Sequence, residues 1–127
     1  MSKKRILICE DETNIRELIK IGLSDDHYEL SEIQDGFSIG TTLFKSNPDL
    51  IILDLRMPTT DGFTVLENIQ KFYLDKDKKP PKILVVSAFI DDSTIPKIQE
   101  LPATDWLSKP FHLEELREKV KQILEKE

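Results

Sequence analysis

The chain has 127 residues, enough for one compact domain with a buried core. Hydrophobic residues make up 39% and charged residues 33% of the sequence, which is typical of a folded globular protein rather than a disordered or fibrous one. The formal net charge of −6 argues against a domain that grips a nucleic-acid backbone by itself, and no apolar run is long enough to cross a membrane.

The first part of the chain alternates predicted strands with predicted helices. Residues 5–9 form a short, almost wholly apolar run, which is typical of a strand covered on both faces. Apolar residues then recur at helical spacing over 13–24, whereas 28–33 alternates like a more exposed strand. Residues 36–46 are predicted to form the next helix, although the serine, glycine and threonines within it are poor helix formers.

The middle of the chain repeats this order. Residues 50–55 have the pattern of a second buried strand, and the turn-rich segment 57–62 leads into an amphipathic helix over 63–73. A polar loop is expected over 74–81, followed by a fourth apolar strand at 83–87.

The last part of the chain completes the pattern. A weak helical stretch over 91–101 contains Pro96, which must lie in a first turn or break the helix. Residues 105–108 are predicted to be a short strand, and the apolar residues over 113–124 line one face of a final helix. Strand and helix thus alternate five times, which predicts a parallel sheet with helices on both faces.

Chemically useful side chains stand at the carboxyl ends of the predicted strands. Glu10 and Asp11 follow the first strand, Asp54 lies at the end of the third, Ser87 ends the fourth, and Lys109 follows the fifth. Any one of them could be polar only because loops are hydrated. In open parallel sheets, however, ligands bind beyond the carboxyl ends of the strands, at the point where the strand order reverses. The five side chains together therefore favour a functional site at that edge of the sheet.

The residue types indicate what such a site could do. Clustered carboxylates raise one another's pKa unless a cation joins them, and Mg²⁺ suits a few carboxylates together with phosphate oxygens. Lys109 would add an ammonium group and Ser87 a hydroxyl donor. Such groups around one free carboxylate suit phosphoryl transfer, with Asp54 as a candidate nucleophile that becomes an aspartyl-phosphate.

Four motifs resemble the receiver domain of two-component response regulators. They are Cys9-Glu10-Asp11-Glu12, Leu53-Asp54-Leu55-Arg56-Met57-Pro58-Thr59-Thr60-Asp61-Gly62, Val85-Val86-Ser87-Ala88 and Asp105-Trp106-Leu107-Ser108-Lys109-Pro110-Phe111. The resemblance covers essentially the whole chain. It implies a single receiver domain over residues 1–127, with a flavodoxin-like, doubly wound five-stranded sheet in the order 2-1-3-4-5.

The resemblance also implies a phosphoacceptor and a metal site. Asp54 would accept a phosphoryl group from a sensor histidine kinase, a phosphotransfer protein or a small phosphodonor. Mg²⁺ or Mn²⁺ would be held by Glu10, Asp11, Asp54 and the Arg56 backbone carbonyl. Glu10 stands where the family usually has aspartate, and a bridging water can absorb its extra methylene group. The domain would catalyse only its own phosphorylation and dephosphorylation, and so would not be an enzyme with separate substrates.

A conformational switch is the next implication. Lys109 and Ser87 would stabilise the phosphoryl group, and Ser87 and Trp106 would carry the change to a partner-binding face around the fourth helix, fifth strand and fifth helix. For Trp106, packing alone and packing combined with switching are both open. The Lys109–Pro110 peptide bond is expected to be cis, because proline makes that isomer accessible.

Arg56 and Phe89 occupy positions that influence dephosphorylation in this family. One hypothesis is that Phe89 shields the acyl phosphate from water and that Arg56 pairs with it, which would lengthen the lifetime of the phosphorylated form. The alternative is that both side chains point to solvent.

Other functions are weighed against the receiver. A binder of flavin mononucleotide would need a hydroxyl- and glycine-rich loop after the first strand, where this chain has acids. A phosphohydrolase with an aspartate nucleophile would want a second carboxylate at Arg56 and a cap insertion. A degenerate receiver that acts only as an interaction module, or a receiver excised from a larger transcriptional regulator, remains an alternative.

The expected setting is the cytoplasm, since the single cysteine, Cys9, cannot form a disulfide within the chain and is expected to be an inert core thiol. The expected partners are a kinase or phosphotransfer protein and an output protein that the sequence does not identify. Direct nucleic-acid binding and membrane insertion are not expected, and a dimer that forms on phosphorylation is compatible with the sequence.

Overall fold

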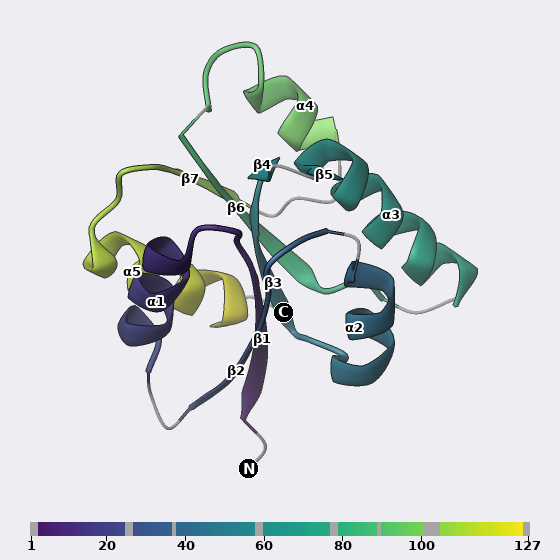
Figure 1. Ribbon diagram of the computed structural model, residues 1–127, viewed down its shortest axis with the longest axis horizontal. Helices are drawn as coiled ribbons and strands as arrows, with labels where there is room; N and C mark the ends of the chain where they lie inside the picture. The colour runs from purple at the N-terminus through teal and green to yellow at the C-terminus, as the bar shows by residue number, and fades with distance from the viewer. Residues whose placement is uncertain are drawn as a thin grey trace.

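The structure is a computed structural model, and it describes residues 3–24, 27–36, 38–57, 60–76, 79–88, 90–100 and 105–125. Its main sheet has five parallel strands in the order β2-β1-β3-β6-β7 (Figure 1). These strands are β1 (Lys4–Cys9), β2 (Tyr28–Ile33), β3 (Leu50–Asp54), β6 (Lys82–Ser87) and β7 (Asp105–Ser108). If only the five strands of this sheet are numbered along the chain, their order in the sheet is 2-1-3-4-5, as the resemblance implies.

A small antiparallel hairpin follows β3 and was not predicted as strand. It consists of β4 (Arg56–Met57) and β5 (Thr60–Asp61). The sequence indicates only a turn here, because strands of two residues are too short to have a hydrophobic period.

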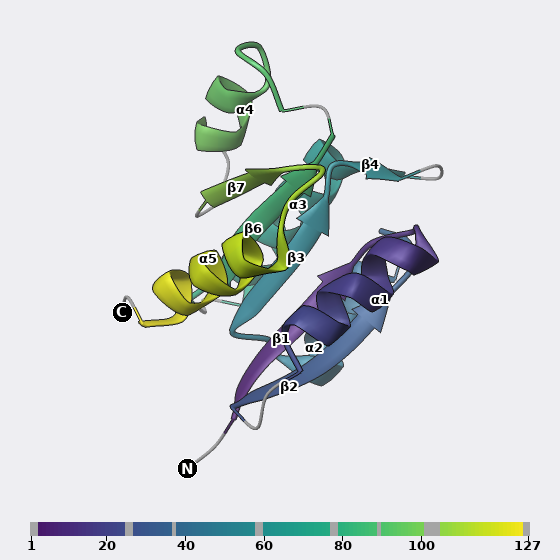
Figure 2. The same ribbon diagram turned by 90° about the vertical axis from the view of Figure 1, so that its left-hand side faces the viewer.

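Helices cover both faces of the sheet. They are α1 (Thr13–Gly22), α2 (Ile39–Ser46), α3 (Gly62–Asp75), α4 (Ile95–Glu100) and α5 (Leu113–Glu125). Side chains of α1 and α5 pack on one face, and those of α2, α3 and α4 pack on the other (Figure 2). Among the described residues, no helix is both long and apolar enough to cross a membrane.

The central strands alternate between the two cores. In β1, Ile6 and Ile8 face the core under α1 and α5, whereas Leu7 and Cys9 face the core under α2 and α3. All four are fully buried, because both faces of the strand are covered. This explains why the central strands read as continuous apolar runs rather than alternating ones.

Two helices begin later than predicted, because side-chain turns precede them. The Asp35 carboxylate accepts hydrogen bonds from the backbone N–H and the hydroxyl of Ser38, and α2 begins at Ile39. The Asp91 carboxylate likewise accepts the backbone N–H groups of Ser93 and Thr94, and α4 begins at Ile95. Pro96 is the second residue of α4 and so lies in the first turn.

The junction of the hairpin with α3 requires glycine. The Gly62 N–H donates to the Leu55 carbonyl over 2.9 Å, and a Cβ atom at Gly62 would lie 2.4 Å from the Leu55 Cα. The Asp61 carboxylate accepts the N–H of Phe63 and caps the helix. The segment that follows Asp54 is therefore held against the start of α3.

Candidate functional site

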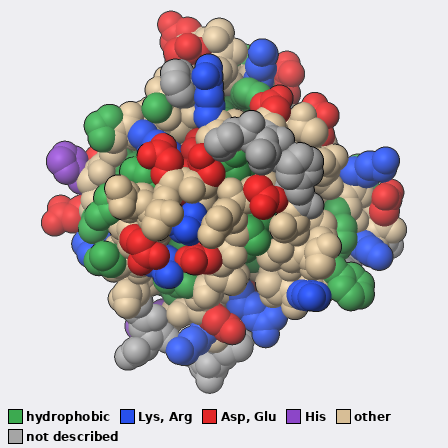
Figure 3. All heavy atoms as spheres, viewed as in Figure 1, with side chains coloured by type: hydrophobic (Ala, Val, Ile, Leu, Met, Phe, Trp, Pro, Cys, Tyr) green, Lys and Arg blue, Asp and Glu red, His purple; other side chains and the backbone are tan. Residues whose placement is uncertain are grey.

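Three carboxylates meet at the carboxyl ends of adjacent strands. Glu10 and Asp11 follow β1, and Asp54 is the last residue of β3, which pairs with β1. Each offers one oxygen, and these oxygens all lie within 4.8 Å of one another. Glu10 and Asp54 are buried. Acidic side chains also gather in the upper half of the face in Figure 3, toward the carboxyl ends of the strands.

Lys109 places its ammonium group between two of these carboxylates. Its Nζ lies 2.6 Å from Glu10 Oε1 and 3.1 Å from Asp54 Oδ2. The Lys109 backbone N–H donates to the Ser87 carbonyl over 2.9 Å, and the Lys109–Pro110 bond is cis, as the resemblance implies. Lys109 and Glu10, which are 99 positions apart in the sequence, thus form a partly buried ion pair.

Asp54 is oriented from both sides. Its Oδ1 accepts the backbone N–H of Arg56 over 3.0 Å, and its Oδ2 accepts Lys109. Glu10 is held in the same way, because its second oxygen, Oε2, accepts the backbone N–H of Glu12 over 3.3 Å. Both carboxylates are therefore fixed before any ligand arrives.

Burial and charge shift the titration of this cluster. Burial raises the pKa of Glu10 to about 7, with a further increase from the negative Asp54, although the hydrogen bond from Lys109 opposes it. Burial acts to lower the pKa of Lys109, but its hydrogen bond to Glu10 and the charge of Asp54 outweigh that effect and leave the pKa above its ordinary value. Lysine thus stays charged while Glu10 titrates near neutrality.

The other residues predicted to belong to the site are Ser87, Trp106, Arg56 and Phe89. Ser87 is buried at the end of β6, next to the backbone of Lys109. Trp106 lies on β7 in register with Val85 and is half-buried against the core under α3 and α4. The Arg56 side chain is exposed, and Phe89 lies outside the described residues.

Cys9 lies beneath the acidic cluster as an inert thiol. Burial, together with the negative charges of Asp35 and Glu10, raises its pKa to about 12. Its Sγ lies 3.7 Å from Met57 Sδ within the core. The thiol therefore stays protonated near neutral pH and acts as a small apolar side chain.

Sequence reasoning missed Arg16. This residue of α1 is buried, and its Nη1 donates to the backbone carbonyls of Glu10 and Asp11 over 2.9 and 3.4 Å. An arginine in a helix is usually assigned to the solvent side. Arg16 nevertheless stands three residues before the buried Ile19, at the spacing of the apolar face, and that spacing was the available signal.

The donor set fits a hard divalent cation. All three side chains offer carboxylate oxygens, the ligands that Mg²⁺ and Mn²⁺ prefer. A cation would also relieve the repulsion among three carboxylates at this spacing. The cluster together with Lys109 can hold a cation and a phosphoryl group near Asp54.

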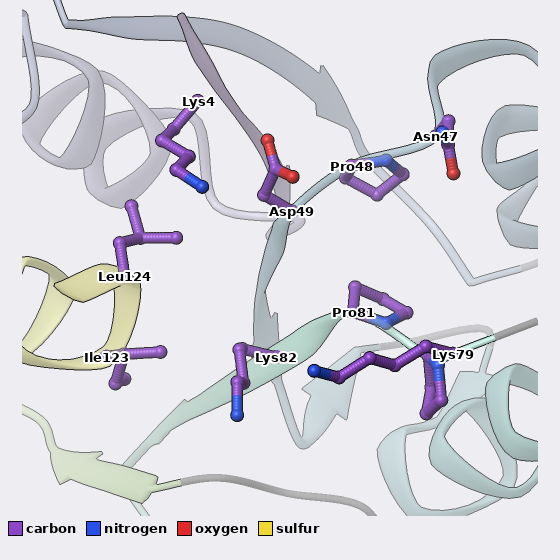
Figure 4. Close-up of a pocket in the computed structure, with 10 residues that line it drawn as sticks. Lys4, Asn47, Pro48, Asp49, Lys79, Pro81, Lys82, Ile123 and Leu124 are labelled. Atoms are coloured by element: carbon purple, nitrogen blue, oxygen red, sulfur yellow. The ribbon is translucent and has the colours of Figure 1, made fainter. Parts of the chain in front are cut away.

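A separate cavity of about 280 Å³ lies at the opposite, amino edge of the sheet and holds none of these residues (Figure 4). Asp49 lies in its wall, and its groups join three strands. Its backbone N–H donates to the Arg5 carbonyl, its carboxylate accepts the Arg5 N–H, and its carbonyl accepts the Lys82 N–H. The polar groups of Asp49 thus connect β1, β3 and β6.

The sheet order and the acidic pocket with its lysine define a doubly wound α/β protein of the receiver class. The chain belongs to the response regulator receiver domain family, which matches residues 6–121.

Particular relatives agree with this assignment. The chain is 35% identical over 124 residues to the DNA-binding dual master transcriptional regulator RpaA of Synechocystis sp., covering 94% of this chain and 48% of that protein. It is 27% identical to the sporulation initiation phosphotransferase F of Bacillus subtilis, covering 98% and 96%. The structure of the chemotaxis protein CheY4 of Vibrio cholerae superposes with a TM-score of 0.84 at 25% identity, over 96% of this chain and 99% of that one. The chain spans about half the length of most curated relatives that it matches.

Proposed function

We propose that Asp54 is the residue that accepts the phosphoryl group in this receiver. The observation that carries the proposal is its buried carboxylate, held by Lys109 and by the Arg56 N–H inside a cluster of three acids. The donor would be a sensor histidine kinase, a phosphotransfer protein or a small molecule such as acetyl phosphate. No separate substrate is turned over, because the protein's chemistry is confined to gaining and losing this group.

In the proposed step, an Asp54 oxygen attacks phosphorus and forms a P–O bond while the bond from phosphorus to the donor breaks. A bond to histidine nitrogen breaks for a kinase donor, and a bond to an acyl oxygen breaks for acetyl phosphate. The Lys109 ammonium and the Ser87 hydroxyl would hold phosphoryl oxygens. Mg²⁺ bound by Glu10 and Asp11, and by Asp54 and the Arg56 carbonyl, would supply charge neutralisation.

The proposed output is a change in the surface formed by α4, β7 and α5. Ser87 would move toward the phosphoryl group, and Trp106 would adjust with it. Inverting a 1:99 equilibrium requires about 5.5 kcal/mol, which a few charge-assisted hydrogen bonds of about 1.5–3 kcal/mol each could supply. Binding of an output protein, or dimerisation, would read the new surface.

Relatives suggest two settings for this switch. RpaA is named a DNA-binding transcriptional regulator and is about twice as long as this chain, whereas the phosphotransferase of similar length is named for phosphoryl transfer. We propose phosphorylation-dependent partner binding as the function that both settings share. A pulldown with and without beryllofluoride, a mimic of the phosphoryl group, would identify the partner and the state it prefers.

The lifetime of the phosphorylated form is a further part of the proposal. Phe89 would shield the acyl phosphate from water, and Arg56 would pair with it. Phe89→Asn should then accelerate decay of the aspartyl-phosphate, measured by the loss of intact mass over time. Unchanged or slower decay in the variant would rule out shielding.

Intact-mass measurement with acetyl phosphate and Mg²⁺ tests the main proposal. The wild type should gain the mass of one phosphoryl group, and Asp54→Asn should gain none. Asp61→Asn is the matched control, because Asp61 is an exposed cap of α3 outside the cluster and asparagine also caps helices. Equal labelling of the Asp54→Asn protein, or none of the wild type, would contradict the proposal.

A further inference from the structure

Arg16 is a buried charge outside the groups so far assigned to the reaction. The buried polar or charged side chains of the described residues are Glu10, Arg16, Asp54 and Ser87. Three of these belong to the site, but Arg16 lies on α1. A buried guanidinium group is unfavourable unless its donors are used, so its contacts indicate what holds it there.

One end of the Arg16 side chain holds the loop that carries the acids. Nη1 donates to the Glu10 carbonyl over 2.9 Å and approaches the Asp11 carbonyl at 3.4 Å. The Arg16 backbone N–H donates to the Glu12 carbonyl over 2.9 Å, which is the ordinary hydrogen bond of the first turn of α1. The side chain therefore holds two consecutive carbonyls of the β1–α1 loop, and the carboxylates of Glu10 and Asp11 lie close to that of Asp54.

The other side of the guanidinium group faces β2. Arg16 Nε lies 3.7 Å from Glu32 Oε1 and is the buried side-chain nitrogen without a hydrogen-bond partner among the described residues. Lys20 holds the second Glu32 oxygen over 3.0 Å. Glu32 is thus a fixed countercharge that keeps the guanidinium group beneath the loop.

We infer that Arg16 is a positioning residue for the cation site of this receiver. Its side chain donates to backbone carbonyls and so fixes the backbone from which Glu10 and Asp11 project. This inference rests on the proposed function, because it assumes that the cluster binds a cation.

Loss of Arg16 would act through the loop. Without Nη1, the carbonyls of Glu10 and Asp11 lose a buried donor, and the loop relaxes away from the geometry that gathers the carboxylates. Residues that orient metal ligands in this way typically change metal affinity by about 10–100-fold when they are removed. Folding depends much less on them, because both cores of the sheet stay intact.

Arg16→Met tests the inference, since methionine keeps much of the volume and removes the donors. Arg117→Met is the matched control, because Arg117 Nε donates to the Gly22 carbonyl at the other end of α1 over 2.8 Å, away from the acids. Calorimetric titration with Mg²⁺ should give a dissociation constant about tenfold or more weaker for Arg16→Met. Arg117→Met should stay within about twofold of the wild type.

A second readout separates positioning from general damage. Arg16→Met should be labelled by acetyl phosphate more slowly than the wild type, and its rate should recover when Mg²⁺ is raised to saturation. Arg117→Met should be labelled at the wild-type rate without additional Mg²⁺. An unchanged Mg²⁺ affinity in Arg16→Met, or an equal loss in Arg117→Met, would overturn the inference. If Arg16→Met does not fold, Glu32→Gln takes its place; it should weaken Mg²⁺ binding several-fold, and an unchanged affinity would overturn the inference equally.

Asp11→Asn distinguishes this inference from the proposed function. If Asp11→Asn leaves Mg²⁺ binding intact, the cation site itself is wrong. If Asp11→Asn weakens binding and Arg16→Met does not, only the role of Arg16 is wrong.

Discussion

Glu10 is the nearer of the two carboxylates that hold Lys109. Its Oε1 lies 2.6 Å from Lys109 Nζ, which is closer than the 3.1 Å between Lys109 Nζ and Asp54 Oδ2. Its other oxygen accepts the Glu12 N–H. In the absence of a cation, Lys109 is thus held mainly by Glu10, and metal binding must compete with that ion pair.

The raised pKa of Glu10 should make any binding of Mg²⁺ by the cluster depend on pH. Its carboxyl group has a pKa of about 7, and a cation needs the deprotonated form, so binding releases a proton below that pH. The Mg²⁺ dissociation constant should fall about tenfold between pH 6 and pH 8. Calorimetry at several pH values measures this, and Glu10→Gln should flatten the profile. The same slope in Glu10→Gln would assign the titration to another group.

At this scale the sequence predicted that the three acids and Lys109 lie together, but it did not predict Arg16. Glu10, Asp11 and Asp54 could be found because polar residues directly follow apolar strands whose ends meet at one edge of the sheet. Arg16 could not be found in this way, because its role depends on where the loop carbonyls point. Only the three-dimensional structure gives that direction.

At the scale of elements, the contact of Gly62 with Leu55 fixes the segment after Asp54. In Gly62→Ala, the added Cβ would meet backbone atoms at 2.4 Å, which cannot move cheaply, so we expect a loss of about 3 kcal/mol in the free energy of unfolding. Gly40→Ala is the control, since a Cβ at Gly40 would meet no atom within 4 Å and alanine favours the helix by about 0.5–1 kcal/mol. Urea denaturation measures both, and equal effects would contradict the contact argument.

The turn before α4 gives a second prediction at this scale. The Asp91 carboxylate accepts the Ser93 hydroxyl and the backbone N–H groups of Ser93 and Thr94, and these hydrogen bonds lower its pKa. Asp91→Ala should loosen α4 alone, with faster amide hydrogen exchange in Ile95–Glu100 and little change in global unfolding. Asp92→Ala is the matched control, and equal exchange in both variants would show that the cap does not hold the helix.

Element types could be predicted well and element ends less well. The central strands agree within one residue, because burial on both faces leaves an uninterrupted apolar run. The predicted starts of α2 and α4 are too early in the sequence. Asp35 and Asp91 form hydrogen-bonded turns there, and the composition of these turns does not distinguish them from the first turn of a helix. The β4–β5 hairpin has no hydrophobic period that could reveal it.

At the scale of the whole molecule, cation binding should stabilise the fold. Glu10 and Asp11 follow β1 whereas Asp54 ends β3, so the three carboxylates are brought together only in the folded state, and a ligand of the cluster favours that state. Mg²⁺ at 100 times its dissociation constant should add about 2.7 kcal/mol to the free energy of unfolding. Asp11→Asn should lose this increment in urea denaturation, whereas Asp105→Asn, which removes an ion pair with Lys119, should retain it. An increment that survives in Asp11→Asn would place the cation elsewhere.

Asp49 has a consequence for the chemistry at the far edge. Its carboxylate accepts the Arg5 N–H, which adds one side-chain hydrogen bond to the backbone hydrogen bonds that align β1, β3 and β6. A loss of this alignment at the amino ends of the strands would shift their carboxyl ends, where Glu10, Asp11 and Asp54 lie close together. A substitution of Asp49 would therefore lower activity in a kinetic assay in the same way as a substitution in the acidic cluster, although Asp49 does not contact that cluster.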